Sequence, residues 1–297
     1  MVAFILIAHE IARHVAMLLL KFAQRLPGTV ASSQTWKGSE AFRSRLGARY
    51  PILFGFICDR TDPRRSTGLL LTLMIVAAFY LAALFSGLSE DILEAEETIR
   101  IDNVVNAAFA PWHVEPLVSI FFWITALGSS PSIISAVIIS TGFLWSQRRF
   151  YIILPLWVTC LGALATTSIG KFLIGRHRPE ITIDVTVMTS SFPSGHATAA
   201  MAVYGFLGYA IARVLPSVRE RFEVGYGTVV LILLIGFSRI FLSVHYFTDV
   251  IGGFLVGGFW LLIGFTIAEW TGTDKLNRPD GSDDPIKDLS MLRDGGP

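Results

Sequence analysis

Long apolar runs alternate with short polar segments over most of this chain. Each run is close to the ~20 residues that an α-helix needs to cross the hydrocarbon of a membrane. We therefore predict an all-α integral membrane protein, built as a bundle of six membrane-spanning helices. The predicted spans are 68–88, 117–146, 150–171, 194–214, 224–243 and 247–270.

The segments between and beside the spans are more polar. The sequence GSSP at 128–131 should break or kink the second span, because proline removes a helical hydrogen bond. Residues 89–113 have the pattern of an amphipathic connection. The six spans together define a domain over 67–270.

Both ends of the chain differ from this central domain. Residues 1–22 mix apolar side chains with His9, Glu10 and Arg13, which is typical of an amphipathic helix at the membrane surface rather than of a signal peptide. We therefore read 1–66 as an amphipathic, cytoplasmic extension. The tail, 271–297, is rich in Asp, Gly and Pro and is expected to be a disordered cytoplasmic segment.

Composition supports the membrane assignment. The chain is 53% hydrophobic and only 16% charged, whereas about a quarter of a soluble domain is charged. A net charge of only +1 argues against a nucleic-acid partner. Cys58 and Cys160 are too few for a disulfide framework, and the spacing of Cys and His suggests no zinc site.

The basic residues predict an orientation. With the N-terminus in the cytoplasm, the cytoplasmic segments hold 19 of the 24 Lys and Arg residues. Because cytoplasmic loops are enriched in Lys and Arg, both termini should lie inside. Four of the other five, Lys171, Arg176, Arg178 and Arg239, belong to the first and third of three polar motifs at the outer ends of the spans. The motifs should therefore meet on one membrane face.

The first motif is KFLIGRHRP at 171–179. The planar guanidinium of Arg178 is suited to grip a phosphate, and Lys171 adds a compact charge. Arg176 could assist phosphate binding, but the sequence favours an ordinary loop cation at this position. Taken alone, the pattern also fits cations that reach from the membrane to its surface.

The second motif, PSGH at 193–196, lies at the predicted start of a span. Ser194 is a suitable N-cap, and Gly195 lets a ligand approach the backbone. The first N–H groups of a helix favour an anion, beside which His196 could donate a proton. A plain helix cap with an interfacial histidine is the structural alternative.

The third motif is SRIFLSVHYFTD at 238–249. His245 and Asp249 are four residues apart, so they should share one face at the start of a helix. The carboxylate would fix the imidazole tautomer and leave Nε2 as a nucleophile. Arg239 adds another cation. The alternative, a His–Asp pair used only for packing, is costly inside a membrane.

Together the ordered motifs K-x6-R-P, P-S-G-H and S-R-x5-H-x3-D resemble the type 2 phosphatidic acid phosphatase superfamily. The resemblance covers 171–249 closely and about 68–270 through the pattern of spans. It implies a metal-independent membrane lipid phosphatase without a cofactor. By position, His245 resembles the nucleophile, Asp249 its orienting partner and His196 the general acid. The phosphate-binding set would be Lys171, Arg178, Ser194, Gly195 and Arg239.

The resemblance implies a lipid phosphate as the partner molecule and leaves its identity open. Phosphatidic acid, phosphatidylglycerol phosphate, a polyprenyl diphosphate and lipid A phosphate present the same group. The same histidine would also serve a lipid phosphotransferase. A non-catalytic lipid-phosphate binder would be expected to lack catalytic residues that are present here. Compact loops favour a bacterial inner membrane, with the site facing the periplasm.

Overall fold

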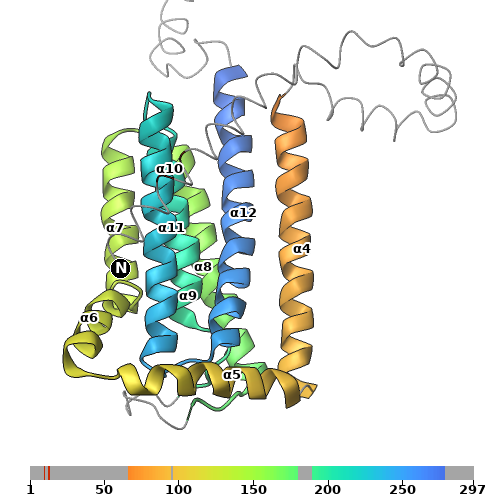
Figure 1. The fold of residues 1–297 in the computed structure, drawn as a ribbon. Helices are drawn as coiled ribbons and strands as arrows, with labels where there is room; N and C mark the ends of the chain where they lie inside the picture. Colours follow the sequence, from red (N-terminus) through yellow and green to blue (C-terminus); the bar gives the residue numbers. More distant parts are fainter. Residues whose placement is uncertain (1–9, 11–12, 14–65, 95, 180–188, 278–297) are drawn as a thin grey trace, which may run out of the picture.

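The computed structural model describes residues 66–94, 96–179 and 189–277, together with Glu10 and Arg13. Within these ranges every regular element is a helix, and most helices run side by side in a bundle (Figure 1). The all-α prediction is therefore confirmed for this part of the chain. The predicted amphipathic segment at 1–66 and most of the predicted tail lie outside the described residues.

Four of the predicted spans appear as single helices that are long and apolar enough to cross a membrane. The second predicted span is a pair of helices bent by 40° at the GSSP sequence, and counting this pair as one span gives five. The four are α4 (Ser66–Glu94), α8 (Phe150–Ile174), α11 (Val218–Phe241) and α12 (Phe247–Asn277), and the bent pair is α6 (Glu115–Ala126) with α7 (Ser130–Ser146).

The remaining predicted span, 194–214, is helical but divided. It consists of α9 (Gly195–Ala199), a π-helical turn η3 (Ala200–Tyr204) and α10 (Gly205–Ala212), in unbroken succession. No piece alone is long enough to cross a membrane, so the count of six spans stays a prediction. Single π-helical turns inside an α-helix are frequent at functional sites.

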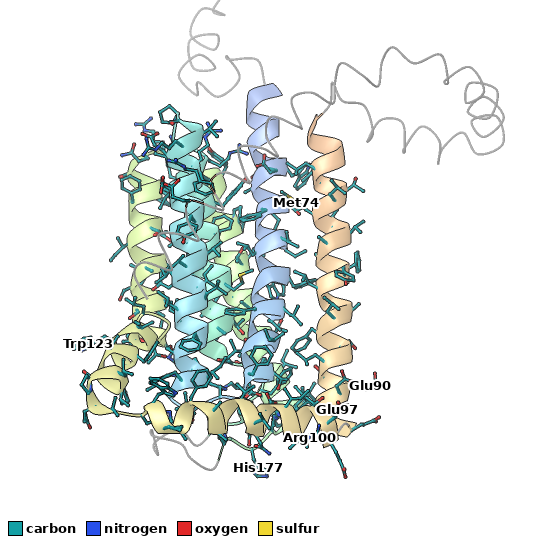
Figure 2. All side chains as sticks on the ribbon, in the orientation of Figure 1. Met74, Glu90, Glu97, Arg100, Trp123 and His177 are labelled. Carbon is teal, nitrogen blue, oxygen red and sulfur yellow. The ribbon has the colours of Figure 1, made fainter. Side chains whose placement is uncertain are left out.

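The connection predicted at 89–113 contains a helix that lies across one end of the bundle. This helix, α5 (Glu96–Phe109), continues into the short 3-10 turn η2 (Ala110–Trp112) and runs at a steep angle to the other helices (Figure 1). One face turns inward, because Asp102 and Asn106 are buried. Arg100 is exposed on the outer side (Figure 2).

Two glycines bring α12 unusually close to α9. A Cβ atom on Gly253 would stand 2.7 Å from the backbone oxygen of Ser194, and one on Gly257 would stand 2.6 Å from that of Thr198. Only glycine permits this approach of two backbones. The small-residue pattern G-x3-G therefore fixes where the PSGH motif sits against the helix that carries Asp249.

The three motifs meet because of how the helices end. Gly175, with φ of 62°, stops α8 in a left-handed cap, and its N–H donates to the carbonyl of Lys171 at 3.2 Å. The ends of α8 and α11 and the starts of α9 and α12 all lie at the end of the bundle crossed by α5 (Figure 1). Arg148, Arg149 and Arg213 lie in the connections between helices at the other end of the bundle (Figure 1).

Candidate active site

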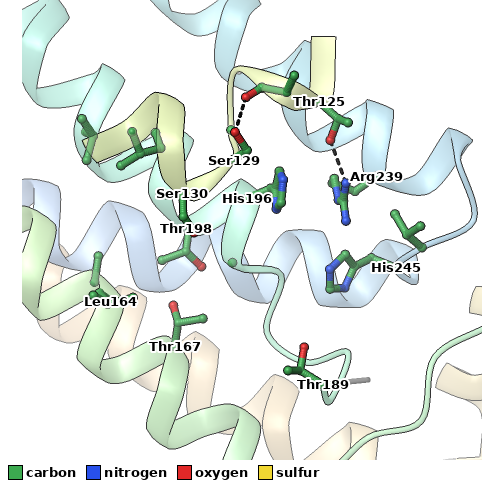
Figure 3. A pocket seen from close by; sticks show the side chains of 18 of the residues that line it. Thr125, Ser129, Ser130, Leu164, Thr167, Thr189, His196, Thr198, Arg239 and His245 are labelled. Atoms are coloured by element: carbon green, nitrogen blue, oxygen red, sulfur yellow. Dashed lines mark hydrogen bonds between the residues drawn. The ribbon is translucent and has the colours of Figure 1, made fainter. Parts of the chain in front are cut away.

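A cavity of about 580 Å³ opens among the α6–α7 bend, α8 and the start of α9. Its polar end is built by the motifs: His196, Arg239 and His245 surround one space (Figure 3). Six predicted site residues line the cavity, namely Lys171, Arg178, Gly195, His196, Arg239 and His245. Ser194 and Asp249 lie behind this lining and are fully buried.

His245 and Asp249 form a buried pair. Nδ1 of His245 lies 3.3 Å from Oδ2 of Asp249, and Nε2 lies 3.5 Å from Nη1 of Arg178. A guanidinium only donates hydrogen bonds, so Nε2 must be the accepting nitrogen and Nδ1 the protonated one. The imidazole is therefore held as the tautomer whose Nε2 lone pair faces the cavity.

The pair is not stacked on one helix as the sequence spacing suggested. His245 precedes α12, which begins at Phe247. The two residues still meet because Asp249 folds back on the helix start, where its Oδ2 accepts a hydrogen bond from the backbone N–H of Tyr246 at 2.9 Å. This contact is one half of a capping box, in which an acidic residue satisfies a backbone donor that the helix leaves free.

Burial lowers the pKa of His245 to about 4. The hydrogen bond and negative charge of Asp249 oppose this shift, while the positive charges of Arg239 and Arg178 reinforce it. The imidazole is consequently neutral near pH 7. A nucleophilic histidine has to be in this state, because a protonated Nε2 has no lone pair to offer.

Arg178 and Lys171 converge on Thr189, at the end of the loop between the first and second motifs. Arg178 donates from Nε to the Thr189 carbonyl at 2.9 Å and from Nη1 to the carbonyl of Val244 at 2.6 Å. Nζ of Lys171 lies 3.4 Å from the Thr189 hydroxyl. These contacts hold both cations in the lining of the cavity, and sequence reasoning had not singled out Thr189.

Arg239 reaches the cavity from the end of α11 and is 6% exposed. Its Nη1 donates to the hydroxyl of Thr125 on α6 at 2.8 Å (Figure 3). Thr125 is itself buried. The bend between α6 and α7 thus contributes to the site by orienting a motif arginine, a role that no sequence motif around Thr125 announces.

The PSGH motif is anchored through its backbone. Ser194 occupies the N-cap position, and its N–H donates to the carbonyl of Asp249 at 2.9 Å. The expected side-chain cap is not formed: among the described residues, the buried Ser194 hydroxyl has no hydrogen-bond partner. Gly195 and His196 follow directly and both line the cavity.

Two further residues complete the surroundings of Asp249. Arg176 pairs with Asp249 and also with Asp102 of α5, each at 2.7 Å. The sequence had favoured an ordinary loop cation over phosphate binding for Arg176, and Asp102 had not been singled out. The available signal was the polar pair Asp102 and Asn106, one turn apart on an amphipathic helix.

The other end of the cavity is apolar. Ile133 and Ile134 of α7, Leu164 and Cys160 of α8, and Val203 line it. Cys160 and Lys171 belong to the same helix, so the lining extends about 16 Å along α8. Within the described ranges, no three His, Cys, Asp or Glu side chains are grouped to hold a metal ion.

Fold and site together define a class: a membrane-embedded helical protein whose buried His–Asp pair faces a cationic cavity. The model of the PAP2 superfamily matches residues 152–272. Phosphatidylglycerophosphatase B of Bacillus subtilis (strain 168) is 33% identical over 159 residues, which are 52% of this chain and 76% of that protein. The chain belongs to the PAP2 superfamily, and it is a membrane phosphatase.

One solved structure agrees with this assignment. The crystal structure of a transmembrane PAP2-type phosphatidylglycerolphosphate phosphatase from Bacillus subtilis matches with a TM-score of 0.60 and 26% identity, covering 69% of this chain and 98% of that one. The crystal structure of Aquifex aeolicus LpxE has a TM-score of 0.45 and 22% identity, covering 58% of this chain and 97% of the other.

Proposed function

We propose that this protein hydrolyses the phosphate monoester or diphosphate of a membrane lipid through a phosphohistidine on His245. The observation that carries the proposal is the orientation of His245: Asp249 holds Nδ1, and Nε2 faces a cavity lined by Lys171, Arg178 and Arg239. Phosphoryl transfer depends on positioning and on neutralising the charge of the oxygens, which these cations supply.

The proposed reaction has two steps. The Nε2 lone pair of His245 attacks phosphorus in line, the bond from phosphorus to the leaving oxygen breaks, and His196 gives that oxygen a proton. Water then attacks phosphorus, with neutral His196 taking its proton, and the N–P bond breaks to release phosphate and the free histidine. Asp249 stabilises the imidazole ring while it carries positive charge.

The binding set consists of cations and backbone rather than acidic groups. Lys171, Arg178 and Arg239 would contact the phosphate oxygens. The Ser194 hydroxyl, which has no hydrogen-bond partner within the part of the chain that the structure describes, would turn toward the bound phosphate beside Gly195. We propose that no metal ion takes part, because these cations provide the charge neutralisation that Mg²⁺ supplies in other phosphoryl-transfer sites.

A lipid substrate is supported by the apolar arm of the cavity. This arm is lined by apolar side chains of α7 and α8, which can hold a hydrocarbon chain away from water. The phosphate would then lie at the cationic end and the chain along Leu164 and Ile134. The similarity to phosphatidylglycerophosphatase B makes phosphatidylglycerol phosphate one candidate substrate.

The proposed orientation puts the site at the periplasmic face of a bacterial inner membrane. Basic residues at the opposite end, including Arg148, Arg149 and Arg213, support it through their expected preference for the cytoplasm. Spheroplasts supplied externally with a short-chain lipid phosphate should release phosphate. Release only after permeabilisation would reverse the orientation.

The decisive experiment is a substrate panel on the purified full-length protein. Phosphate release is measured from phosphatidic acid, phosphatidylglycerol phosphate, a polyprenyl diphosphate and lipid A, beside the variant His245→Ala. At least one lipid should release phosphate in water, and the variant should release none. Transfer to an added lipid alcohol without free phosphate would indicate a phosphotransferase. Substantial hydrolysis by the variant would refute the phosphohistidine.

A further inference from the structure

We propose that Asp102 and Arg176 are positioning residues for the reaction, acting through a buried chain of ion pairs that runs from α5 to Asp249 and from there to His245. The inference rests on the proposed phosphohistidine function and extends it to a helix outside the three motifs. Asp102 and Arg176 would hold the catalytic pair in its reactive orientation and balance its charge, without touching the substrate.

Arg176 is a bridge between two carboxylates. Its Nη2 lies 2.7 Å from Oδ2 of Asp102, and its Nη1 lies 2.7 Å from Oδ1 of Asp249. Nη1 also donates to the hydroxyl of Thr248 at 2.8 Å. The ring of Tyr246 covers the guanidinium, with its centroid 4.4 Å from Cζ. These contacts commit Arg176 to the protein.

The position of Arg176 separates it from the other motif cations. Lys171, Arg178 and Arg239 line the cavity, whereas Arg176 is absent from the lining formed by the described residues. Its side chain is 10% exposed, and the two carboxylates it joins are fully buried. Arg176 therefore supports Asp249 from behind, on the side away from any substrate.

Asp102 connects this series of ion pairs to the start of α12 by hydrogen bonds. Its Oδ1 accepts from the backbone N–H of Thr248 at 3.0 Å, and its Oδ2 accepts from the Thr248 hydroxyl. This carboxylate thereby satisfies one of the N–H groups that a helix start leaves free. Its negative charge also interacts favourably with the positive end of the helix dipole. Helix α5 is locked onto the turn that carries His245.

The series of ion pairs fixes the orientation of Asp249. Its Oδ1 is held by Arg176, and its Oδ2 receives the N–H of Tyr246 and faces Nδ1 of His245. With both oxygens committed, the carboxylate plane has little freedom to rotate. The imidazole that leans on Oδ2 inherits this restriction, so Nε2 stays directed at the cavity.

The charges also suit the reaction. Two carboxylates and one guanidinium leave this cluster with one net negative charge while His245 is neutral. When the Nε2 lone pair forms the bond to phosphorus, the ring keeps its Nδ1 proton and becomes cationic, and the cluster becomes neutral. Facing His245 from the other elements are Arg239 of α11, Arg178 of the loop, Lys171 of α8 and His196 of α9, so Asp102 offsets part of a strongly positive surrounding.

The test compares Arg176→Met, Asp102→Asn and their combination in the purified full-length protein. With the lipid that the wild type hydrolyses best, kcat should fall about 10²-fold in R176M, since small displacements of a nucleophile cost this much. D102N should lose about tenfold, the equivalent of one charged hydrogen bond. KM should change little in either. Because both residues act through the same series of ion pairs, the double variant should be no slower than R176M.

Matched controls are Arg100→Ala and His177→Ala. Arg100 lies two residues before Asp102 on the exposed side of α5, and His177 follows Arg176 in the same loop with an exposed side chain (Figure 2). Both controls should keep wild-type kcat. Arg176→Lys should recover part of the lost activity, because an ammonium group restores the charge but not the two-pronged contact.

The pH profile of kcat/KM gives a readout that a purely structural role would not move. Removing the negative charge of Asp102 should shift the acid limb to lower pH, and removing the positive charge of Arg176 should shift it to higher pH. The substrate is the same in all variants, so its own ionisation cancels. Absent or parallel shifts would overturn the electrostatic part of the inference.

Several results would overturn the positioning role itself. An unchanged kcat with raised KM in R176M would make Arg176 a substrate-binding residue, and wild-type kinetics in both variants would remove the role altogether. If R176M does not fold, Thr248→Val can be used instead, because it removes contacts to both residues without changing the charge. An unchanged kcat in Thr248→Val would refute the positioning role of the ion-pair series. An active His245→Ala would instead refute the proposed function, whatever Arg176 does.

Discussion

The backbone N–H of Ser194 donates a hydrogen bond to the backbone carbonyl of Asp249 over 2.9 Å. This single contact joins the second and third motifs, which come from opposite sides of the α10–α11 hairpin. It brings His196 and His245 to one cavity through the backbone, so the two histidines keep their relation even when a side chain is replaced. The glycine face of α12 makes this contact possible.

Gly253→Ala should therefore disrupt the site. The added Cβ would meet the Ser194 oxygen at 2.7 Å and Cβ of Ala197 at 2.9 Å, and such overpacking costs about 1–3 kcal/mol. Moving α9 away from α12 should lower kcat about 10²-fold. Gly227→Ala on α11, where a Cβ meets nothing within 4 Å, is the matched control. Equal activity of the two variants would contradict the close-packing argument.

Thr125→Val should weaken the hold on Arg239. The valine keeps the shape but removes the acceptor of the 2.8 Å hydrogen bond from Nη1. A hydrogen bond to a charged group contributes about 1.5–3 kcal/mol, so kcat/KM should fall about 10- to 100-fold. Thr266→Val on α12, whose hydroxyl donates to the carbonyl of Leu262 in the same helix, should leave kcat/KM unchanged. Steady-state kinetics that match the wild type would show that Arg239 needs no such support.

His196→Ala should separate substrates by their leaving groups. If His196 protonates the departing oxygen, its loss should slow hydrolysis of an alkyl lipid phosphate about 10²–10⁴-fold. An aryl phosphate, whose phenolate leaves without a proton, should suffer far less. The ratio of the two rates is measured for variant and wild type in the same detergent. An equal loss with both substrates would assign His196 to binding instead.

The buried, neutral His245 predicts how stability depends on pH. Its pKa of about 4 lies below the ordinary value of 6.5, so between these values the unfolded chain binds a proton that the folded protein excludes. Stability should therefore fall as the pH drops from 6.5 to 4, by about 3 kcal/mol from this residue. Between pH 7 and pH 4.5, the unfolding temperature of His245→Gln should fall less than that of the wild type. An identical loss would mean that His245 is not buried as a neutral group.

Chelation should leave activity intact. In the proposed function the charge of the phosphate would be met by Lys171, Arg178 and Arg239. Among the described residues, the carboxylate next to the proposed nucleophile is Asp249, and it is committed to Arg176 and His245. Phosphate release in excess EDTA should therefore equal that in buffer. Activity that disappears with EDTA and returns with Mg²⁺ would require a metal in the reaction.

Much of the candidate site was predictable because chemistry-bearing residues are conspicuous in an apolar chain. A charged side chain in a membrane span is costly, so Lys171, Arg239 and Asp249 stand out without any structure. Two details were wrong. The spacing of His245 and Asp249 suggested stacking on one helix, but the helix begins after His245, and Ser194 does not cap with its hydroxyl.

The sequence by itself determined the helical class, the approximate ends of the spans and the convergence of three motifs on one face. It did so because span length is set by membrane thickness and because each crossing reverses the chain. Only the tertiary structure decided the partners: Thr125 for Arg239, Thr189 for Lys171 and Arg178, and Asp102 for Arg176. The contacts of Thr125 and Asp102 join residues far apart in the chain. Their geometry depends on where α5 and α6 lie against the bundle, which no local pattern encodes.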